Sequence, residues 1–181
     1  MVADGLFPRW FPDGKRLYFG SADISSVPVT GGEPRKVVQP ADRSAPSNGG
    51  TMEFSFAPDG KWFVIAAGKP SDVHLWKMTS TGSDPQQISK GQAGAPVWSP
   101  DGSTIFFATS RDSGSTYQLE RGGLNIWRIS PDGRDERPVT ALTGRRGYMG
   151  LSTATDGRFV YFTWRDDVAD IWMMDVERGR R

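Results

Sequence analysis

The sequence predicts an all-β protein made of repeated four-stranded antiparallel sheets. A tight Pro-Asp-Gly turn recurs between apolar stretches, columns of apolar residues keep one register after each turn, and a later stretch ending in Ile-Trp follows at variable distance. Self-similarity at this scale is the signature of a repeat architecture. We therefore expect one repeated unit throughout the chain.

The turn is the best-defined element of each repeat. Proline fixes φ at the first turn position, aspartate bonds its own downstream backbone, and glycine accepts positive φ, so these three residues prescribe a reversal between two strands. The copies are Pro12-Asp13-Gly14, Pro58-Asp59-Gly60, Pro100-Asp101-Gly102 and the degraded Thr155-Asp156-Gly157.

The strand after each turn is apolar on both faces. Three residues after the glycine stand Leu17, Phe63, Ile105 and Val160, and five residues after it stand Phe19, Ile65, Phe107 and Phe162. The column between them holds Tyr18, Val64, Phe106 and Tyr161. A strand that is apolar on both faces is covered on both sides, so we expect the sheets to stack on one another.

Two further strands complete each repeat. The third is expected at Asp23-Ile24, His74-Leu75-Trp76, Asn125-Ile126-Trp127 and Asp170-Ile171-Trp172, and a fourth at residues 33–38, 84–88 and 136–139. Because tryptophan recurs at one strand position, we predict packing between repeats rather than a sugar-stacking platform, with Trp127 buried against a neighbouring repeat.

These residues resemble a known family. The run Trp98-Ser99-Pro100-Asp101-Gly102, followed by an apolar strand and an Asp/Asn-Ile-Trp strand, is similar to the WD40-like blade of the TolB family. It also resembles the propellers of prolyl oligopeptidase-type and tricorn-type peptidases. The resemblance covers about Pro8 to Met174 and implies a β-propeller, in which blades pack face to face around a central channel.

The whole chain, 1–181, is expected to form one propeller domain or fragment. The blades are expected at about 7–38, 54–89, 96–140 and 151–176, and the fourth lacks its outer strand. A missing strand leaves an unpaired edge, so we expect a partial propeller from a protein with six or more blades. A closed four-bladed ring is the alternative.

Composition narrows the classes of partner. The chain has 22 Lys and Arg against 21 Asp and Glu, so its charge gives no general attraction to nucleic acid or to an anionic membrane. It has no cysteine, and no apolar run approaches the ~20 residues that insert across a bilayer. No secretory signal is expected in the first residues, whereas the TolB resemblance implies a periplasmic location.

The sequence indicates no catalytic, cofactor or metal site. His74 is the one histidine, and its column otherwise holds Asp23, Asn125 and Asp170, which favours a hydrogen-bonding role at the start of a strand. The repeated turn aspartates are expected to form turns. No Gly-x-Ser-x-Gly, phosphate-binding or dinucleotide-binding motif occurs.

Candidate binding residues lie in the connections. In a propeller, the loops between the second and third strands and the links between blades emerge on one face, and rigid scaffolds carry binding on such loops. Arginine and tyrosine are favoured at protein interfaces. The candidates for partner binding are Arg111, Asp112, Tyr117, Glu120, Arg121, Arg145, Arg146, Tyr148, Arg165 and Asp166. The alternative is an ordinary polar rim.

The resemblance supports three readings of function. The first is a non-enzymatic scaffold resembling TolB, which binds a protein or peptide partner through the loop face. The alternative is an accessory or gating propeller of a prolyl oligopeptidase-type or tricorn-type serine peptidase, whose catalytic domain is not in this chain. In both cases further blades or a catalytic domain of a longer parent chain would be partners. A third reading is a hydrolase or lyase that uses loop carboxylates.

Overall fold

A computed structural model describes residues 6–20, 24–38, 53–69, 72–111, 124–142, 148–165 and 170–175. Their strands form four antiparallel sheets, and in each sheet every strand pairs with the strand that precedes or follows it in the sequence. The first sheet contains β1 (Leu6–Trp10), β2 (Arg16–Gly20), β3 (Ile24–Pro28) and β4 (Arg35–Val38). The second contains β5 (Glu53–Phe56), β6 (Trp62–Lys69), β7 (Asp72–Thr79) and β8 (Gln86–Gln87).

The third and fourth sheets follow the same plan. The third contains β9 (Gly94–Trp98), β10 (Ile105–Thr109), β11 (Asn125–Ile129) and β12 (Arg137–Pro138). The fourth contains β13 (Tyr148–Thr155), β14 (Phe159–Arg165) and β15 (Asp170–Asp175). In the described ranges no helix is long and apolar enough to cross a bilayer.

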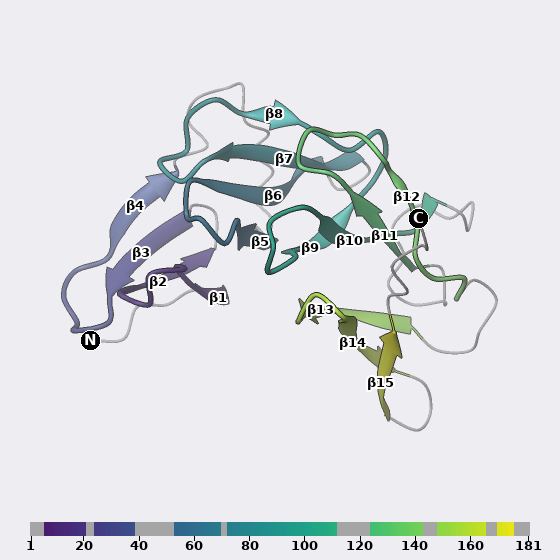
Figure 1. The fold of residues 1–181 in the computed structure, drawn as a ribbon. Helices are drawn as coiled ribbons and strands as arrows, with labels where there is room; N and C mark the ends of the chain where they lie inside the picture. The colour runs from purple at the N-terminus through teal and green to yellow at the C-terminus, as the bar shows by residue number, and fades with distance from the viewer. Residues whose placement is uncertain are drawn as a thin grey trace.

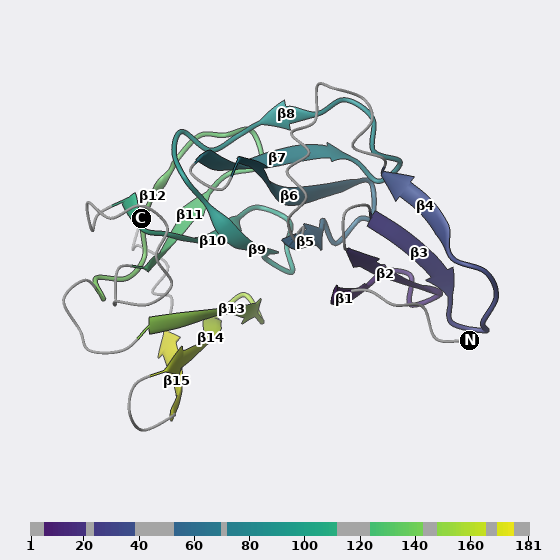
Figure 2. The same ribbon diagram turned by 180° about the vertical axis from the view of Figure 1, so that it is seen from behind.

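The sheets are the blades of a partial β-propeller. Figure 1 shows them following one another around an arc, with β1, β5, β9 and β13 on the inner side and β4, β8 and β12 on the outer side. The view from behind shows the same arc, open between the first and the fourth sheet (Figure 2). The predicted fold class is therefore confirmed.

Blade-to-blade packing forms three apolar clusters. Tyr18 of the first blade packs with Phe63 and Ile65 of the second. The opposite face of the second blade presents Val64, which packs with Ile105 and Phe107 of the third. The third blade in turn presents Phe106 to Val160 and Phe162 of the fourth. The second strands of the two middle blades, β6 and β10, therefore use their alternating columns for two different neighbours.

The two end blades each leave one face less covered. In β2, Tyr18 is buried toward the second blade, whereas Leu17 and Phe19 on the other face are only partly buried. In β14, Val160 and Phe162 are buried toward the third blade, whereas Tyr161 is partly buried. Open faces at the two ends are what a partial propeller requires.

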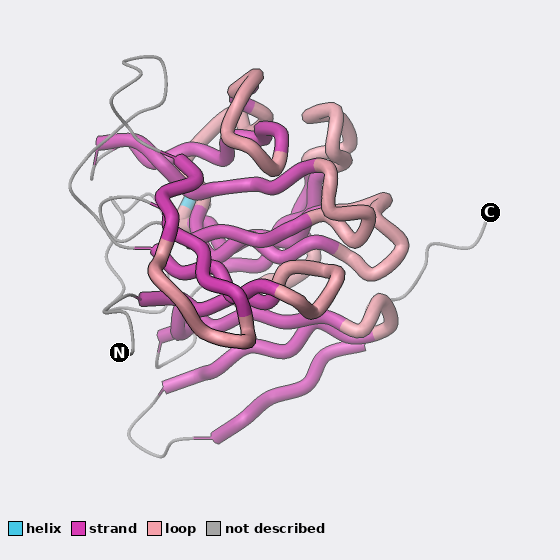
Figure 3. The backbone as a smooth tube through the Cα atoms, turned by 90° about the vertical axis from the view of Figure 1, so that its left-hand side faces the viewer, coloured by secondary structure: helices cyan, strands magenta, loops and turns pink. Residues whose placement is uncertain are grey.

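The repeated turns stack on one another. A Cβ built on Gly60 would lie 3.0 Å from the Phe11 ring, and one on Gly102 would lie 3.6 Å from Cδ of Pro58. Both glycines have positive φ, +68° and +73°. Figure 3 shows several of these turns side by side at one end of the sheets. Glycine is therefore required here by the backbone conformation and, at Gly60, also by the close approach of the preceding blade.

The fourth strands are shorter than predicted. The expected stretch 84–88 narrows to Gln86–Gln87, and 136–139 narrows to Arg137–Pro138. Asp84 and Asp135 adopt φ of 56° and 51°, so the preceding turns extend through them. Pro138 also has no N–H to continue a ladder.

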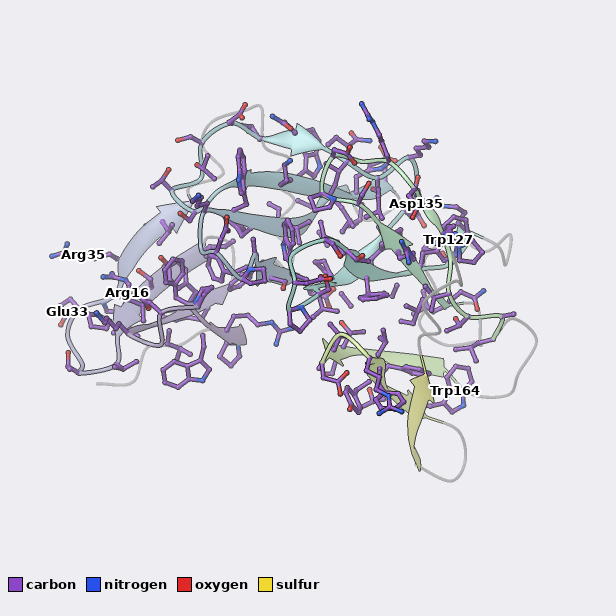
Figure 4. All side chains as sticks on the ribbon, in the orientation of Figure 1. Arg16, Glu33, Arg35, Trp127, Asp135 and Trp164 are labelled. Atoms are coloured by element: carbon purple, nitrogen blue, oxygen red, sulfur yellow. The ribbon has the colours of Figure 1, made fainter. Side chains whose placement is uncertain are left out.

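The prediction for Trp127 needs a correction. Its side chain packs against the cluster between the second and third blades, as expected, but it is only partly buried. Trp127 pairs with Pro138 in the outermost strand β12, so it lies toward the outer rim of the blade, where its side chain stays partly exposed. Figure 4 shows Trp127 near Asp135 on the outer side of the third sheet.

Candidate partner-binding face

The ends of the second strands position the described candidates. β10 ends at Thr109, two residues before Arg111, and β14 ends at Arg165 itself. The Pro-Asp-Gly turns lie at the opposite ends of the same strands. Arg111 and Arg165 therefore stand at the same edge of neighbouring blades.

The fourth blade brings two candidates together. Tyr148 begins β13 and is the antiparallel partner of Arg165, and Met149 pairs with Trp164. The register then shifts between Met149 and Thr153. A bulge of this kind bends an inner strand and re-aims its residues. Tyr148 and Arg165, 17 positions apart, thus lie directly opposite each other.

Arg111 is held by the third blade. Its guanidinium carbon lies 4.7 Å from the centroid of the Trp127 ring, and its Nη2 lies 2.9 Å from Oε1 of Glu136. A Cβ on Gly91 would come within 2.9 Å of its Nε, so glycine leaves room for the guanidinium. The Arg111 side chain is 23% exposed. It is a fixed cation at the edge of the face rather than a freely moving one.

Hydrogen bonding around this ion pair is incomplete. Nε and Nη2 of Arg111 and Oε2 of Glu136 are buried without a hydrogen-bond partner among the described residues. The 2.9 Å contact between Nη2 and Oε1 is thus a close charge pair that does not meet the geometry of a hydrogen bond. The backbone N–H of Lys90 donates to the same oxygen at 3.4 Å.

The other candidates are not placed. Asp112, Tyr117, Glu120, Arg121, Arg145, Arg146 and Asp166 lie outside the described residues. For Tyr148 and Arg165 the structure describes the backbone pairing. Partner binding by this set stays a prediction.

Glu53 is a buried acid on an inner strand and was not among the residues predicted from the sequence. Glu53 opens β5, is 5% exposed, and accepts a hydrogen bond on Oε2 from the backbone N–H of Ala95 in the third blade. Oε1 is buried without a partner among the described residues. Burial raises the pKa of this carboxyl to about 7, against smaller lowering effects of the Ala95 N–H and Arg9. An acid inside the run Glu-Phe-Ser-Phe was the available signal.

The inner strands are tied together by polar contacts. Nε of Arg9 in β1 donates to the carbonyl of Phe54 at 3.2 Å, linking the first two blades. Oγ1 of Thr153 in β13 donates to the carbonyl of Ala95 at 2.7 Å, linking the last two. With the Glu53 contact, each junction between successive blades carries at least one such bond.

His74 and the turn aspartates, which the sequence predicts to be structural, make hydrogen bonds to neighbouring residues. His74 Nε2 lies 2.8 Å from Oδ1 of Asp72, and its Nδ1 lies 3.3 Å from Nε2 of Gln87. Oδ1 of Asp59 accepts from the Lys61 N–H at 3.0 Å, and Asp156 accepts from Arg158 and Phe159. Those hydrogen bonds lower the pKa of Asp156. Within the described ranges no three His, Cys, Asp or Glu residues group as metal ligands.

No family model matches the chain. The uncharacterized protein Atu1656 of Agrobacterium fabrum is 25% identical over 184 residues, covering 93% of this chain and 57% of that protein. Dipeptidyl-peptidase 5 of Porphyromonas endodontalis is 30% identical over 135 residues, covering 70% of this chain and 17% of that protein. The chain spans less than two thirds of the length of either relative.

Solved structures show the same fold. A protein provisionally designated TolB from Agrobacterium tumefaciens superposes with a TM-score of 0.72 at 21% identity, covering 99% of this chain and 65% of that one. TolB from Acinetobacter baumannii gives 0.67 at 18%, with 98% and 42% covered. A prolyl endopeptidase gives 0.60 at 12%, with 95% and 27% covered. The chain has a TolB-like β-propeller fold.

Proposed function

We propose that this TolB-like propeller is a non-enzymatic scaffold that binds a protein or peptide partner on the face formed by its inter-blade links and its loops between second and third strands. The observation that supports it most is the placement of Arg111, Tyr148 and Arg165 at one edge of neighbouring blades. Loops on a rigid scaffold are the usual place for such binding.

The charge of the candidate set indicates the chemistry of the partner. The ten candidates include arginines at 111, 121, 145, 146 and 165, against acids at 112, 120 and 166. Guanidinium groups pair with carboxylates in bidentate geometry, and complementary charge speeds encounter and selects partners. We expect an acidic segment on the partner.

Site-specific photocrosslinking in cells that make the protein tests this proposal. A photoreactive amino acid replaces Tyr148 or Arg165 on the loop face. The control position is Arg134, which is 86% exposed on the opposite face that carries the Pro-Asp-Gly turns, the turn face. The two loop-face positions should crosslink to one protein, and position 134 should not crosslink to that protein. Equal crosslinking of that protein from position 134, or none from either loop-face position, would contradict the proposal.

A second candidate function is an accessory propeller of a serine peptidase. The likeness to Dipeptidyl-peptidase 5 and to a prolyl endopeptidase favours it. Fluorophosphonate labelling of the full product of the gene separates the two. Absence of a labelled serine agrees with the scaffold, and a labelled serine outside these 181 residues establishes the peptidase reading.

A further inference from the structure

A pocket of about 320 Å³ lies between the second and third blades, at the turn end of the sheets. Its walls include Ala57 and Trp62 of the second blade and Trp98 and Gly102 of the third. This end is opposite to the candidate partner-binding face, since the Pro-Asp-Gly turns lie at the other ends of the strands. The volume is within the ordinary range for a ligand site.

The neighbouring blade junction shows what fills the same place. Between the first and second blades, the ring of Phe11 lies 5.1 Å from that of Phe56 and 5.5 Å from that of Tyr18, measured between centroids. Its edge lies over Gly60. The residue before the Pro-Asp-Gly turn thus supplies an aromatic ring that closes the first junction.

The second junction lacks that ring. Ala57 is the equivalent of Phe11, Val64 the equivalent of Tyr18, and Trp98 the equivalent of Phe56, each by its distance from the turn glycine. Two rings are replaced by small side chains, and Gly102 takes the place of Gly60. The pocket therefore occupies the position that the Phe11 ring holds one blade earlier.

Polar groups surround this space. Nζ of Lys77 lies 4.9 Å from the centroid of the Trp62 ring and donates to the carbonyl of Pro131 at 2.8 Å, crossing from the second blade to the third. Asp59 and Asp101, from successive turns, are exposed and line the pocket. The two carboxylates outnumber the one ammonium among the lining side chains, so the pocket favours a cationic neighbour.

We propose that this pocket receives an aromatic side chain of a peptide that carries a basic residue next to it. The ring stacks over Gly102 and against Trp98, as Phe11 does over Gly60 and against Phe56. The basic residue lies at the rim, near Asp59 and Asp101. This site is separate from the loop face, and its occupancy does not depend on the function proposed for that face.

Nuclear magnetic resonance titration of the chain with capped dipeptides tests the assignment. The probes are acetyl-Phe-Arg-amide, acetyl-Ala-Arg-amide and acetyl-Phe-Glu-amide, and the reporters are the indole N–H signals of Trp62 and Trp98. Acetyl-Phe-Arg-amide should bind at least about tenfold more tightly than acetyl-Ala-Arg-amide, the ratio expected for burying one phenyl ring. It should bind about threefold more tightly than acetyl-Phe-Glu-amide, as for an exposed ion pair.

The repeat supplies a matched variant. Ala57→Phe places in the second junction the side chain that already closes the first, and it should abolish the titration shifts. Ala141→Phe adds the same ring at an exposed position in the link that follows β12, and it should leave them unchanged. If Ala57→Phe does not fold, Trp62→Ala removes one wall and should weaken binding by about tenfold.

Three results would overturn the proposal. They are unchanged binding by folded Ala57→Phe or by Trp62→Ala, equal affinity for the Phe-Arg and Ala-Arg probes, and equal or tighter binding of the Phe-Glu probe. Either of the first two results would contradict a site for an aromatic side chain. The third would contradict the preference for a basic residue at the rim.

Discussion

Trp10 and Trp98 stand at the same place in their blades, two residues before the Pro-Asp-Gly turn, yet Trp10 is 64% exposed and Trp98 is 7% exposed. Trp98 packs in the cluster between the second and third blades. Trp10 belongs to the first blade, and the face of that blade turned away from the second blade has no neighbour among the described residues. The difference in exposure between these two side chains shows how much an adjoining blade covers at this position.

Trp98→Ala should lower the free energy of unfolding by about 3 to 4 kcal/mol, the cost of deleting a large aromatic from a packed core. Trp10→Ala should change it by less than about 0.5 kcal/mol, as for most exposed positions. Urea denaturation of both variants checks the difference. Equal losses would show that Trp10 is covered in solution.

Amide exchange should follow the burial of the second strands. Stacked repeats gain stability from both neighbours, so Phe63 to Ile65 and Ile105 to Phe107 should exchange most slowly. The strands β2 and β15 should exchange fastest, and the open faces should promote self-association. Sedimentation of a strict monomer at tens of micromolar, with equal protection in all four blades, would contradict the partial propeller.

The raised pKa of Glu53 should make the protein less stable as the pH rises toward neutrality. Its pKa is raised from 4.5 to about 7 by burial, so between these values the folded state binds more protons than the unfolded state. Stability should therefore fall as pH rises from about 4.5 to about 7, by about 3 kcal/mol, and then level off. Thermal denaturation across this range measures the loss.

The matched variants separate this effect from other titrations. Glu53→Gln should remove most of the slope, whereas Glu33→Gln, at an exposed position, should retain it. The lowered pKa values of Asp132 and Asp156 act below about pH 4, outside the window. A slope that Glu53→Gln leaves intact would assign the effect to another group.

Gly14 and Gly60 isolate the contact between turns. Both have φ of +68°, but a Cβ on Gly14 meets nothing within 4 Å, whereas one on Gly60 meets the Phe11 ring at 3.0 Å. Gly14→Ala should cost about 1 kcal/mol from the backbone alone. Gly60→Ala should cost about 1 kcal/mol more because the ring must shift. Equal costs in chemical denaturation would show that the Phe11 ring does not restrict the side chain at position 60.

Most of the fold could be predicted because the same turn and strand pattern recurs in every blade. The turn triplets and the columns around Phe63, Ile105 and Val160 fix register, strand order and stacking, and the structure follows them. The ends of the fourth strands could not be predicted, since they depend on positive φ at Asp84 and Asp135. The partial exposure of Trp127 reflects its place beside the outermost strand β12.

The site was less predictable. A common loop face follows from strand order, because Arg111 and Arg165 stand at the ends of the second strands of neighbouring blades. The pairing of Arg111 with Glu136 and the contact of Glu53 with Ala95 join residues 25 and 42 positions apart, and no local pattern encodes them. The pocket beside Ala57 becomes visible only when one junction is compared with another.

Charge reversal on the two faces tests the proposed function most directly. The partner identified by crosslinking is titrated with Arg145→Glu/Arg146→Glu, which the sequence predicts on the loop face, and with Arg134→Glu/Arg137→Glu on the turn face, where both side chains are exposed. The loop-face variant should bind at least about tenfold more weakly, and the turn-face variant should stay within about twofold of the parent. An unchanged affinity in the loop-face variant, with a loss in the turn-face variant, would contradict a partner-binding loop face.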